Sequence, residues 1–213
     1  MARTHLVWDW NGTLLDDFAL VVTATNQAFA AVGGPGVSAE EHRTRFRRPV
    51  AEFYAEILER AVDDEEFGRL DRIFHDAYRL GLTTMALAAD AKEALTSWSG
   101  SQSLLSMWFH SELVPALETY GLTGHFTRVD GLRTEVGGDL KAGHLAGHLR
   151  EIGVTGTETV LIGDSLDDAA AATANGAAVV LYTGGFTDAT RLRTVGCPVA
   201  DSLVEAVEIA RTL

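Results

Sequence analysis

Short apolar runs that end in turn residues recur along this chain, and they predict buried strands. The first spans His5 to Trp10 and ends at Asn11-Gly12. Four further runs come much later, at residues 102–107, 126–132, 158–162 and 178–182. Helix-like segments alternate with them, at about residues 110–121, 141–152 and 167–175. This alternation predicts an α/β fold in which helices cover both faces of a parallel sheet.

The stretch between the first and second predicted strands has a different pattern, typical of successive helices. Ser38 precedes Glu41 by three residues, and Asp63 precedes Glu66 by the same spacing, which indicates two helix starts. Apolar residues around Phe53 also recur at helical spacing, which favours a small helical bundle. We therefore expect residues 17–87 to form a helical cap, inserted into a core made of residues 1–16 and 88–213.

Composition narrows the class of protein. Of the 213 residues, 46% are hydrophobic and 22% are charged, which is ordinary for a folded globular protein. No apolar run reaches the roughly 20 residues of a membrane-spanning helix, and the N-terminus lacks signal-peptide features, so we expect a cytoplasmic protein. The net charge of −13 argues against nucleic acid or membranes as partners, because both favour basic surfaces. Cys197 is the only cysteine, which excludes an internal disulfide. Nothing in this composition predicts an oligomeric state.

Polar residues follow the predicted strands at the positions where open parallel sheets bind ligands. Asp9-Trp10-Asn11-Gly12-Thr13-Leu14 follows the start of the first run, and Ser106 lies near the end of the second. Gly163-Asp164-Ser165-Leu166-Asp167-Asp168 follows the fourth run. Lys141, one of only two lysines in the chain, begins the helix before that run. Carboxylates, a hydroxyl and an ammonium are therefore expected at one edge of the sheet.

These four segments, in this order, resemble the four motifs of the haloacid dehalogenase superfamily of phosphatases. Asp9 to Leu14 is similar to the family's Asp-x-Asp-Gly-Thr-Leu, and Val160 to Asp168 is similar to its metal-binding segment. A helical insertion after the first motif is typical of the phosphoglycolate phosphatase and beta-phosphoglucomutase branches. The resemblance covers nearly the whole chain. It implies a Rossmann-like three-layer sheet with an inserted helical cap, and a Mg²⁺-dependent phosphatase that acts on a small phosphorylated metabolite.

The resemblance also implies a role for each motif residue. Asp9 is the expected nucleophile, which forms an aspartyl phosphate that water later hydrolyses. The expected Mg²⁺ ligands are Asp9, Asp164, Asp168 and the backbone carbonyl of Asn11. The expected phosphate-binding residues are Lys141, Ser106, Gly12, Thr13 and Met107. Lys141 and Ser106 are counted with Asp9 and Asn11 as catalytic residues.

Asn11 departs from the family pattern, because family phosphatases keep an aspartate at this position as general acid and base. A carboxamide cannot transfer that proton, and the loss is expected to cost roughly 10²–10⁴ in rate, most for poor leaving groups. A phosphatase resembling the phosphoglycolate phosphatases is the leading prediction. A phosphotransferase, a hydrolase of activated phosphate esters and a non-catalytic phosphate-ligand sensor remain as alternatives.

The predicted cap carries candidates for substrate recognition. Arginines stand at positions 43, 45, 47 and 48 of an otherwise acidic chain. We expect Arg47 or Arg48 to meet a substrate carboxylate or phosphate, since a guanidinium binds planar anions, although a solvated helix face is the plainer alternative. Trp10, next to the expected nucleophile, is a further candidate at the interface with the cap.

Overall fold

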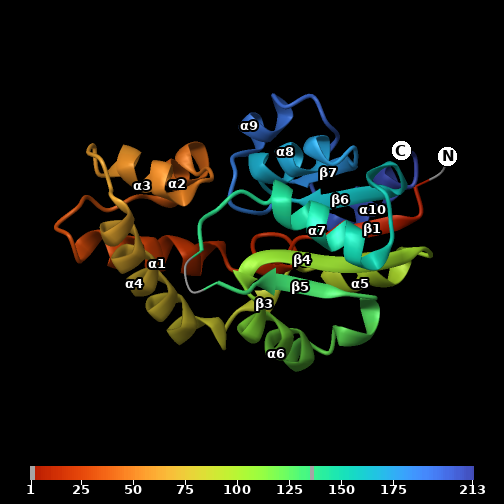
Figure 1. The fold of residues 1–213 in the computed structure, drawn as a ribbon, viewed down its shortest axis with the longest axis horizontal. Helices are drawn as coiled ribbons and strands as arrows, with labels where there is room; N and C mark the ends of the chain where they lie inside the picture. Colours follow the sequence, from red (N-terminus) through yellow and green to blue (C-terminus); the bar gives the residue numbers. More distant parts are fainter. Residues whose placement is uncertain (1–2, 135–136) are drawn as a thin grey trace.

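Two groups of elements lie side by side in the computed structural model, which describes residues 3–134 and 137–213 (Figure 1). The larger group is built on a six-stranded sheet with the order β5-β4-β1-β6-β7-β8. All of its paired strands run parallel. Its strands are β1 His5–Trp8, β4 Ser101–Phe109, β5 Val129–Leu132, β6 Thr159–Gly163, β7 Ala178–Tyr182 and β8 Val199–Ala200. The predicted α/β class with a parallel sheet is confirmed.

The central strand β1 explains why the motif residues meet at one edge. All four of its residues are buried, as expected for an apolar strand with neighbours on both sides. Its last residue, Trp8, pairs in register with Leu104 of β4 and with Ile162 of β6. Residues just beyond these three positions therefore emerge together at the carboxyl edge of the sheet.

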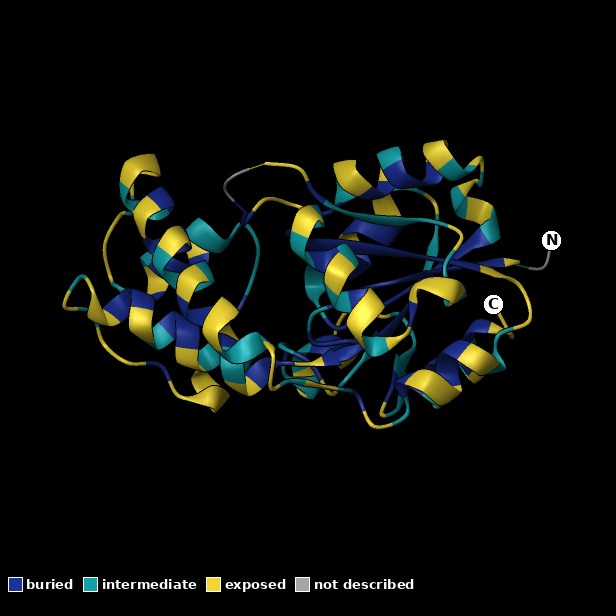
Figure 2. Ribbon diagram, turned by 90° about the horizontal axis from the view of Figure 1, so that it is seen from below, coloured by how far each residue is buried: buried dark blue, intermediate teal, exposed yellow. Residues whose placement is uncertain are grey.

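Helices cover both faces of the sheet. One apolar cluster joins the sheet to α5 (Ala91–Ser97), α6 (His110–Tyr120) and α10 (Leu203–Ala210). A second cluster joins the opposite face to α7 (Ala142–Ile152), α8 (Leu166–Ala174) and α9 (Ala189–Arg193). Figure 2 shows the buried strands between helices whose outer surfaces are exposed. Short 3-10 turns occur at Thr123–His125 and Gly156–Glu158. The result is the three-layer arrangement expected of a Rossmann-like core.

The smaller group consists of four helices, which we call the cap: α1 Phe18–Ala30, α2 Ala39–Arg45, α3 Val50–Ile57 and α4 Asp64–Leu82. The two predicted helix starts are confirmed. Ser38 and Glu41 form a complete capping box at α2, and the Asp63 side chain accepts a hydrogen bond from Glu66 N at α4. The cap has its own apolar cluster, which includes Phe29, Phe53 and Leu70.

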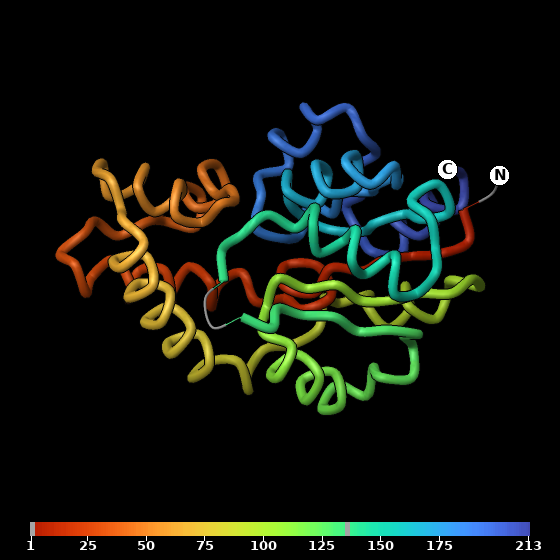
Figure 3. The backbone as a smooth tube through the Cα atoms, in the orientation of Figure 1, coloured from red at the N-terminus to blue at the C-terminus, as the bar shows by residue number. Residues whose placement is uncertain are grey.

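A small antiparallel hairpin joins the cap to the core. Strand β2 (Leu15–Asp16) pairs with β3 (Ala86–Leu87), so the two chain crossings between core and cap lie next to each other. Figure 3 shows these crossings, where the chain leaves after β1 and returns before α5.

Several elements were not predicted. The hairpin, β8, α5, α9 and α10 lie in segments without a long periodic pattern, and β2, β3 and β8 have only two residues each. Strand β1 ends at Trp8, two residues before the predicted end, because the chain turns out of the sheet into the Asp9 loop. No helix in the described part of the chain is long and apolar enough to cross a membrane.

Candidate active site

The loop after β1 holds Asp9 at the carboxyl edge of the sheet. Its backbone N–H donates to the Ile162 carbonyl at 2.9 Å, which extends the parallel pairing by one residue. The chain then folds back, because Thr13 N and Leu15 N both donate to the Trp10 carbonyl, at 3.2 and 2.9 Å. Asp9 is therefore fixed by backbone bonds on both sides of it.

Glycines allow the loops to approach Asp164 closely. Gly12 has a φ of +71°, and a Cβ at this position would lie 2.6 Å from Asp164 Oδ2. A Cβ at Gly185 would lie 2.0 Å from the same oxygen. Side chains at either position would displace the carboxylate. Phe186 N donates to this oxygen at 2.5 Å, so the loop after β7 orients Asp164.

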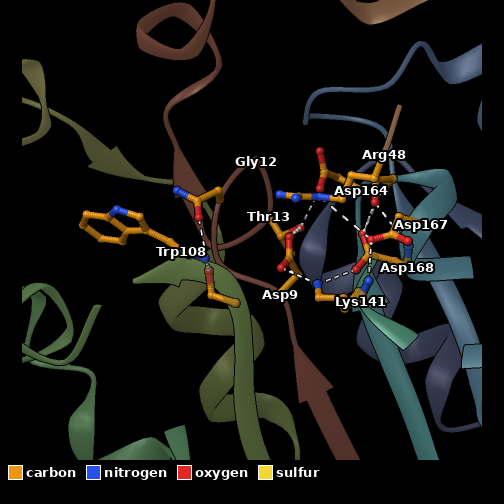
Figure 4. Close-up of polar contacts among 12 residues, drawn as sticks. Asp9, Gly12, Thr13, Arg48, Trp108, Lys141, Asp164, Asp167 and Asp168 are labelled. Carbon is orange, nitrogen blue, oxygen red and sulfur yellow. Dashed lines mark hydrogen bonds and ion pairs between the residues drawn. The ribbon is translucent and has the colours of Figure 1, made fainter. Parts of the chain in front are cut away.

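Lys141 joins two of the aspartates. Its Nζ lies 2.5 Å from Asp9 Oδ1 and 2.5 Å from Asp168 Oδ1, and all three side chains are buried (Figure 4). Lys141 is the N-cap residue of α7, and its backbone N–H donates to Asp167 Oδ2 at 3.0 Å. The start of α7 and the start of α8 are thus held together around this ammonium.

The N-terminus of α8 positions Asp168. Ser165 caps the helix by accepting a hydrogen bond from Asp168 N at 3.2 Å. In return, Asp168 Oδ2 accepts bonds from Ser165 N at 3.0 Å and from Ser165 Oγ at 2.6 Å. This capping box occupies Oδ2 of Asp168 and leaves Oδ1 facing Lys141.

Three aspartates form a group that could hold a metal ion. Each of Asp9, Asp164 and Asp168 offers one carboxylate oxygen, and these oxygens lie within 4.8 Å of one another. Three buried carboxylates carry more negative charge than the single Lys141 ammonium neutralises, and unpaired buried charge is costly. Oxygen ligands of this kind suit Mg²⁺, so the residues present fit the implied ion.

Burial and mutual repulsion perturb the titration of these groups. Burial raises the pKa of Asp9 to about 6 although Lys141 opposes this shift. Burial, with Asp9 and Asp168 nearby, also raises the pKa of Asp164 well above its ordinary value. Burial alone would raise the pKa of Asp168, but Lys141 outweighs it and holds that pKa below its ordinary value. The Asp168 and Asp9 carboxylates likewise outweigh the effect of burial on Lys141 and raise the pKa of its ammonium.

A separate buried network fixes the side chain of Asn11. Its Nδ2 donates to Asp17 Oδ2 at 2.8 Å and to Tyr78 Oη at 2.9 Å. Tyr78 Oη in turn donates to Asp17 Oδ2 at 2.6 Å. Asn11 Oδ1 accepts a bond from Ser106 Oγ at 3.2 Å. The nitrogen of the carboxamide therefore faces Asp17 and Tyr78, and its oxygen faces Ser106.

The predicted phosphate-binding residues are only partly free for that role. Gly12 N donates to Leu15 O at 3.1 Å and to Asp17 Oδ1 at 2.8 Å, so this amide already has acceptors within the chain. Asp17 supplies the physical reason, because its buried carboxylate takes this N–H. Thr13 Oγ1 lies 3.5 Å from both Asp9 Oδ2 and Asp164 Oδ1, within the group of carboxylates.

Two adjoining cavities lie between the core and the cap. The carboxylate cavity is lined by Asp9, Lys141, Asp164 and Asp168. The larger aromatic cavity extends from Asn11 into the cap. Met107 and Arg48, two of the residues predicted from the sequence, line both cavities.

The other two candidates for substrate contact lie elsewhere. Trp10 is fully buried, packs against Tyr120 with 5.8 Å between ring centroids, and lines neither cavity. The alternation of β1 explains this, because Trp10 continues into the same apolar cluster as Trp8. Arg47 forms ion pairs with Glu52 and Glu56 and lines neither of these cavities. Arg47 and Arg48 both lie between α2 and α3, so the alternative of a solvated helix face is wrong for both of them.

Sequence reasoning did not identify Asp17 and Tyr78 as parts of the site. Asp17 could have been found from its place three residues after the first motif segment. In the structure it is buried, and it forms no ion pair with the described residues. Burial raises the pKa of Asp17 to about 6, against the hydrogen bonds from Tyr78, Asn11 and Gly12. Tyr78 carries no local signal, because its contact with Asp17 spans 61 residues of sequence.

Comparison with known proteins places this geometry in a family. A family model described as haloacid dehalogenase-like hydrolase matches residues 4–176. The chain is 27% identical over 199 residues to a phosphoglycolate phosphatase of Chromobacterium violaceum, covering 88% of each protein. It is also 27% identical to a phosphoglycolate phosphatase of Mesorhizobium japonicum, covering 88% of this chain and 86% of that protein.

Solved structures share the fold over nearly the full length. A predicted phosphatase from Clostridium acetobutylicum superimposes with a TM-score of 0.88 at 15% identity, covering 100% of both chains. A predicted phosphoglycolate phosphatase from Haemophilus somnus superimposes with a TM-score of 0.74 at 19% identity, covering 97% of both chains. Both the match to the family model and the shared fold agree with the motifs, and the chain belongs to the haloacid dehalogenase-like hydrolase family.

Proposed function

We propose that this protein is a Mg²⁺-dependent phosphatase that acts on a small phosphorylated substrate through an aspartyl-phosphate intermediate at Asp9. The observation that carries the proposal is the convergence of Asp9, Lys141, Asp164 and Asp168 on one buried cavity. Similarity to two phosphoglycolate phosphatases supports the same class of reaction.

The metal site in this proposal uses the three aspartates, with the Asn11 backbone carbonyl as a further ligand. When bound, Mg²⁺ would neutralise part of the charge on the phosphoryl oxygens and so reduce repulsion between the two anions. Lys141 contributes a second positive charge, with its Nζ 2.5 Å from Asp9 Oδ1. This ammonium keeps Asp9 ionised, which is the form that a nucleophile requires.

The chemistry proceeds in two displacements. An Asp9 carboxylate oxygen attacks phosphorus, the bond to the leaving-group oxygen breaks, and that oxygen keeps the electron pair. Water then attacks the phosphorus of the aspartyl phosphate, and the bond between phosphorus and the Asp9 oxygen breaks. The electron pair returns to the Asp9 carboxylate, and the protons of the water leave with the phosphate. Thr13, and Ser106 when its hydroxyl releases Asn11 Oδ1, are proposed to hold the phosphoryl oxygens during both displacements.

Asn11 limits which leaving groups suit this site. Its carboxamide has no proton to transfer, and its nitrogen is already bonded to Asp17 and Tyr78. The proposed enzyme therefore favours activated esters, whose leaving groups depart as stable anions. The same feature supports a second candidate, a phosphate-ligand sensor that binds without turnover.

Phosphate release from acetyl phosphate, phenyl phosphate, 2-phosphoglycolate and glycerol 3-phosphate, with and without Mg²⁺, tests the proposal. We expect Mg²⁺-dependent turnover that Asp9→Asn abolishes and that Asp16→Asn, which changes an exposed aspartate of β2, leaves unchanged. Turnover that persists in Asp9→Asn would refute the proposed nucleophile. Tight binding of phosphate ligands without turnover of any ester would favour the sensor.

A further inference from the structure

The aromatic cavity lies where the leaving group of a bound phosphate ester would extend. It adjoins the carboxylate cavity, and both are lined by Asn11, Phe46, Arg48, Met107 and Phe186. It spans about 680 Å³, part of it open to solvent. Its walls combine core and cap side chains, among them Trp108, Phe46, Phe53, Phe74 and Tyr78.

The charges around this cavity disfavour an anionic leaving group. Asp71 is buried in its wall and accepts a hydrogen bond from Gly137 N at 3.2 Å. Arg48 already has partners, because its Nε lies 3.9 Å from Asp167 Oδ2 and its Nη1 donates to Asp139 O at 3.2 Å. Burial lowers the pKa of His42 to about 4, so this wall residue is neutral at neutral pH. A substrate carboxylate here would meet aromatic rings, Asp71 with its neighbour His75, and an Arg48 guanidinium that already has partners.

Two buried polar atoms in these walls have no hydrogen-bond partner among the described residues. They are Trp108 Nε1 and His42 Nδ1, on side chains that are at most 4% exposed. Figure 4 shows the Trp108 indole extending away from Asp9 and Lys141. An unpaired buried N–H costs free energy, and a polar substituent on a bound ligand would satisfy it.

We propose that the aromatic cavity receives the leaving group of an aryl phosphate monoester, a flat aromatic alcohol with a polar substituent that accepts a hydrogen bond from Trp108 Nε1. This inference rests on the proposed function and names its substrate class. When Asp9 attacks, the bond between phosphorus and the aryl oxygen breaks and the electron pair stays on the phenoxide. Phenoxides depart without prior protonation, so Asn11 and the aromatic walls select for the same leaving group.

Relative kcat/KM values for four substrates at saturating Mg²⁺ test this inference: acetyl phosphate, phenyl phosphate, 2-naphthyl phosphate and 2-phosphoglycolate. The second ring buries more apolar surface, so 2-naphthyl phosphate should exceed phenyl phosphate by about tenfold. We expect 2-phosphoglycolate to be the poorest of the four. Turnover of acetyl phosphate with no preference for the larger ring, or with 2-phosphoglycolate preferred, would overturn this inference and leave the proposed function standing. Absence of turnover for all four would overturn both.

A variant that fills the cavity gives a second test. Val50, the first residue of α3, lines the aromatic cavity but not the carboxylate cavity. In Val50→Phe, the ratio of kcat/KM for 2-naphthyl phosphate to that for acetyl phosphate should fall by about tenfold. Val195→Phe, at an exposed position outside both cavities, should leave the ratio unchanged. An unchanged ratio in Val50→Phe would contradict the placement of the leaving group.

Binding of 2-naphthol by calorimetry tests the cavity without catalysis. We expect the native protein and Val195→Phe to bind it equally, and Val50→Phe to bind it about tenfold more weakly. If Val50→Phe fails to fold, Trp108→Phe is used in its place, because it keeps an aromatic wall but removes the indole N–H. The probe is then 2,7-dihydroxynaphthalene. Equal binding of that probe by Trp108→Phe and native protein would exclude the proposed hydrogen bond.

Discussion

Three buried side chains hydrogen-bond to Asn11 and so determine what its carboxamide can do. Asp17 and Tyr78 accept bonds from its nitrogen, and Ser106 donates to its oxygen. A carboxylate at position 11 would lie beside the Asp17 carboxylate, and a like charge at that distance favours the protonated form of one of them. The native carboxamide avoids that repulsion but has no proton to supply.

Asn11→Asp should therefore create a general acid. We expect hydrolysis of glycerol 3-phosphate to rise by at least about tenfold, because an alkoxide leaving group needs a proton. Hydrolysis of phenyl phosphate should change much less. Steady-state rates for the two esters, compared with the native protein, provide the measurement. Equal changes for both esters would show that proton transfer to the leaving group does not limit the native rate.

Among individual residues, those that belong to a sequence motif could be predicted, and those that join the site through long-range contacts could not. Asp9, Lys141, Asp164 and Asp168 belong to motifs, and the structure brings all four together. Only the structure distinguishes Arg48 from Arg47, because two residues adjacent in sequence have different surroundings here.

Helix α8 contains a residue that both stabilises the helix and orients a side chain of the site. Its N-cap residue, Ser165, is also the residue that orients Asp168. Helix α10 begins with the same kind of cap, in which Ser202 accepts a bond from Glu205 N at 3.1 Å. Ser202 lines neither cavity, so the two caps allow the structural role to be separated from the role in the site.

Ser165→Ala and Ser202→Ala should each lower the free energy of unfolding by about 1 kcal/mol, the usual cost of losing an N-cap. Only Ser165→Ala should also weaken Mg²⁺-dependent turnover, because it frees Asp168 to rotate. Chemical denaturation and phosphate release measure the two effects. Equal loss of turnover in both variants would indicate that the Ser165 N-cap affects turnover only through the stability of the protein.

Helices and strands with long periodic patterns were the elements that could be predicted. Strand β7 was predicted with its observed bounds, Ala178–Tyr182. The hairpin of β2 and β3 could not be predicted, because strands of two residues are too short to show alternation. They are defined only by their pairing with each other.

In the whole molecule, the cap is held against the core beside the site. Arg191 of α9 donates from Nη1 to the carbonyls of Arg43 and Phe46, at 3.1 and 3.0 Å. Asp188 N also donates to Arg43 O at 3.1 Å, and Arg43 Nε donates to Gly185 O at 3.0 Å. These bonds connect the cap to the loop that orients Asp164. They favour the closed arrangement, in which the cap packs against the core beside the two cavities.

Arg191→Met should shift the molecule towards an open arrangement, because it removes two hydrogen bonds from a charged donor. We expect hydrogen exchange of the peptide that contains Asp188 to accelerate by about tenfold or more. Arg193→Met, in the same helix, removes an exposed ion pair with Asp201 and should leave this exchange unchanged. Equal exchange in the two variants would show that Arg191 does not hold the cap closed.

The motif order along the chain allowed the grouping of the motif residues and the inserted helices to be anticipated, but not the bonds that hold the cap against the core. Closure depends on backbone carbonyls of α2 and its neighbours as acceptors, and every residue has such a carbonyl, so the sequence contains no signal for it.

The most direct test is chemical trapping of the intermediate. The protein is mixed with acetyl phosphate and Mg²⁺, quenched rapidly, reduced with borohydride and mapped by mass spectrometry. An aspartyl phosphate at Asp9 predicts conversion of that residue alone to homoserine, dependent on Mg²⁺ and absent in Asp9→Asn. Turnover of acetyl phosphate without modification of Asp9 would contradict the proposed reaction.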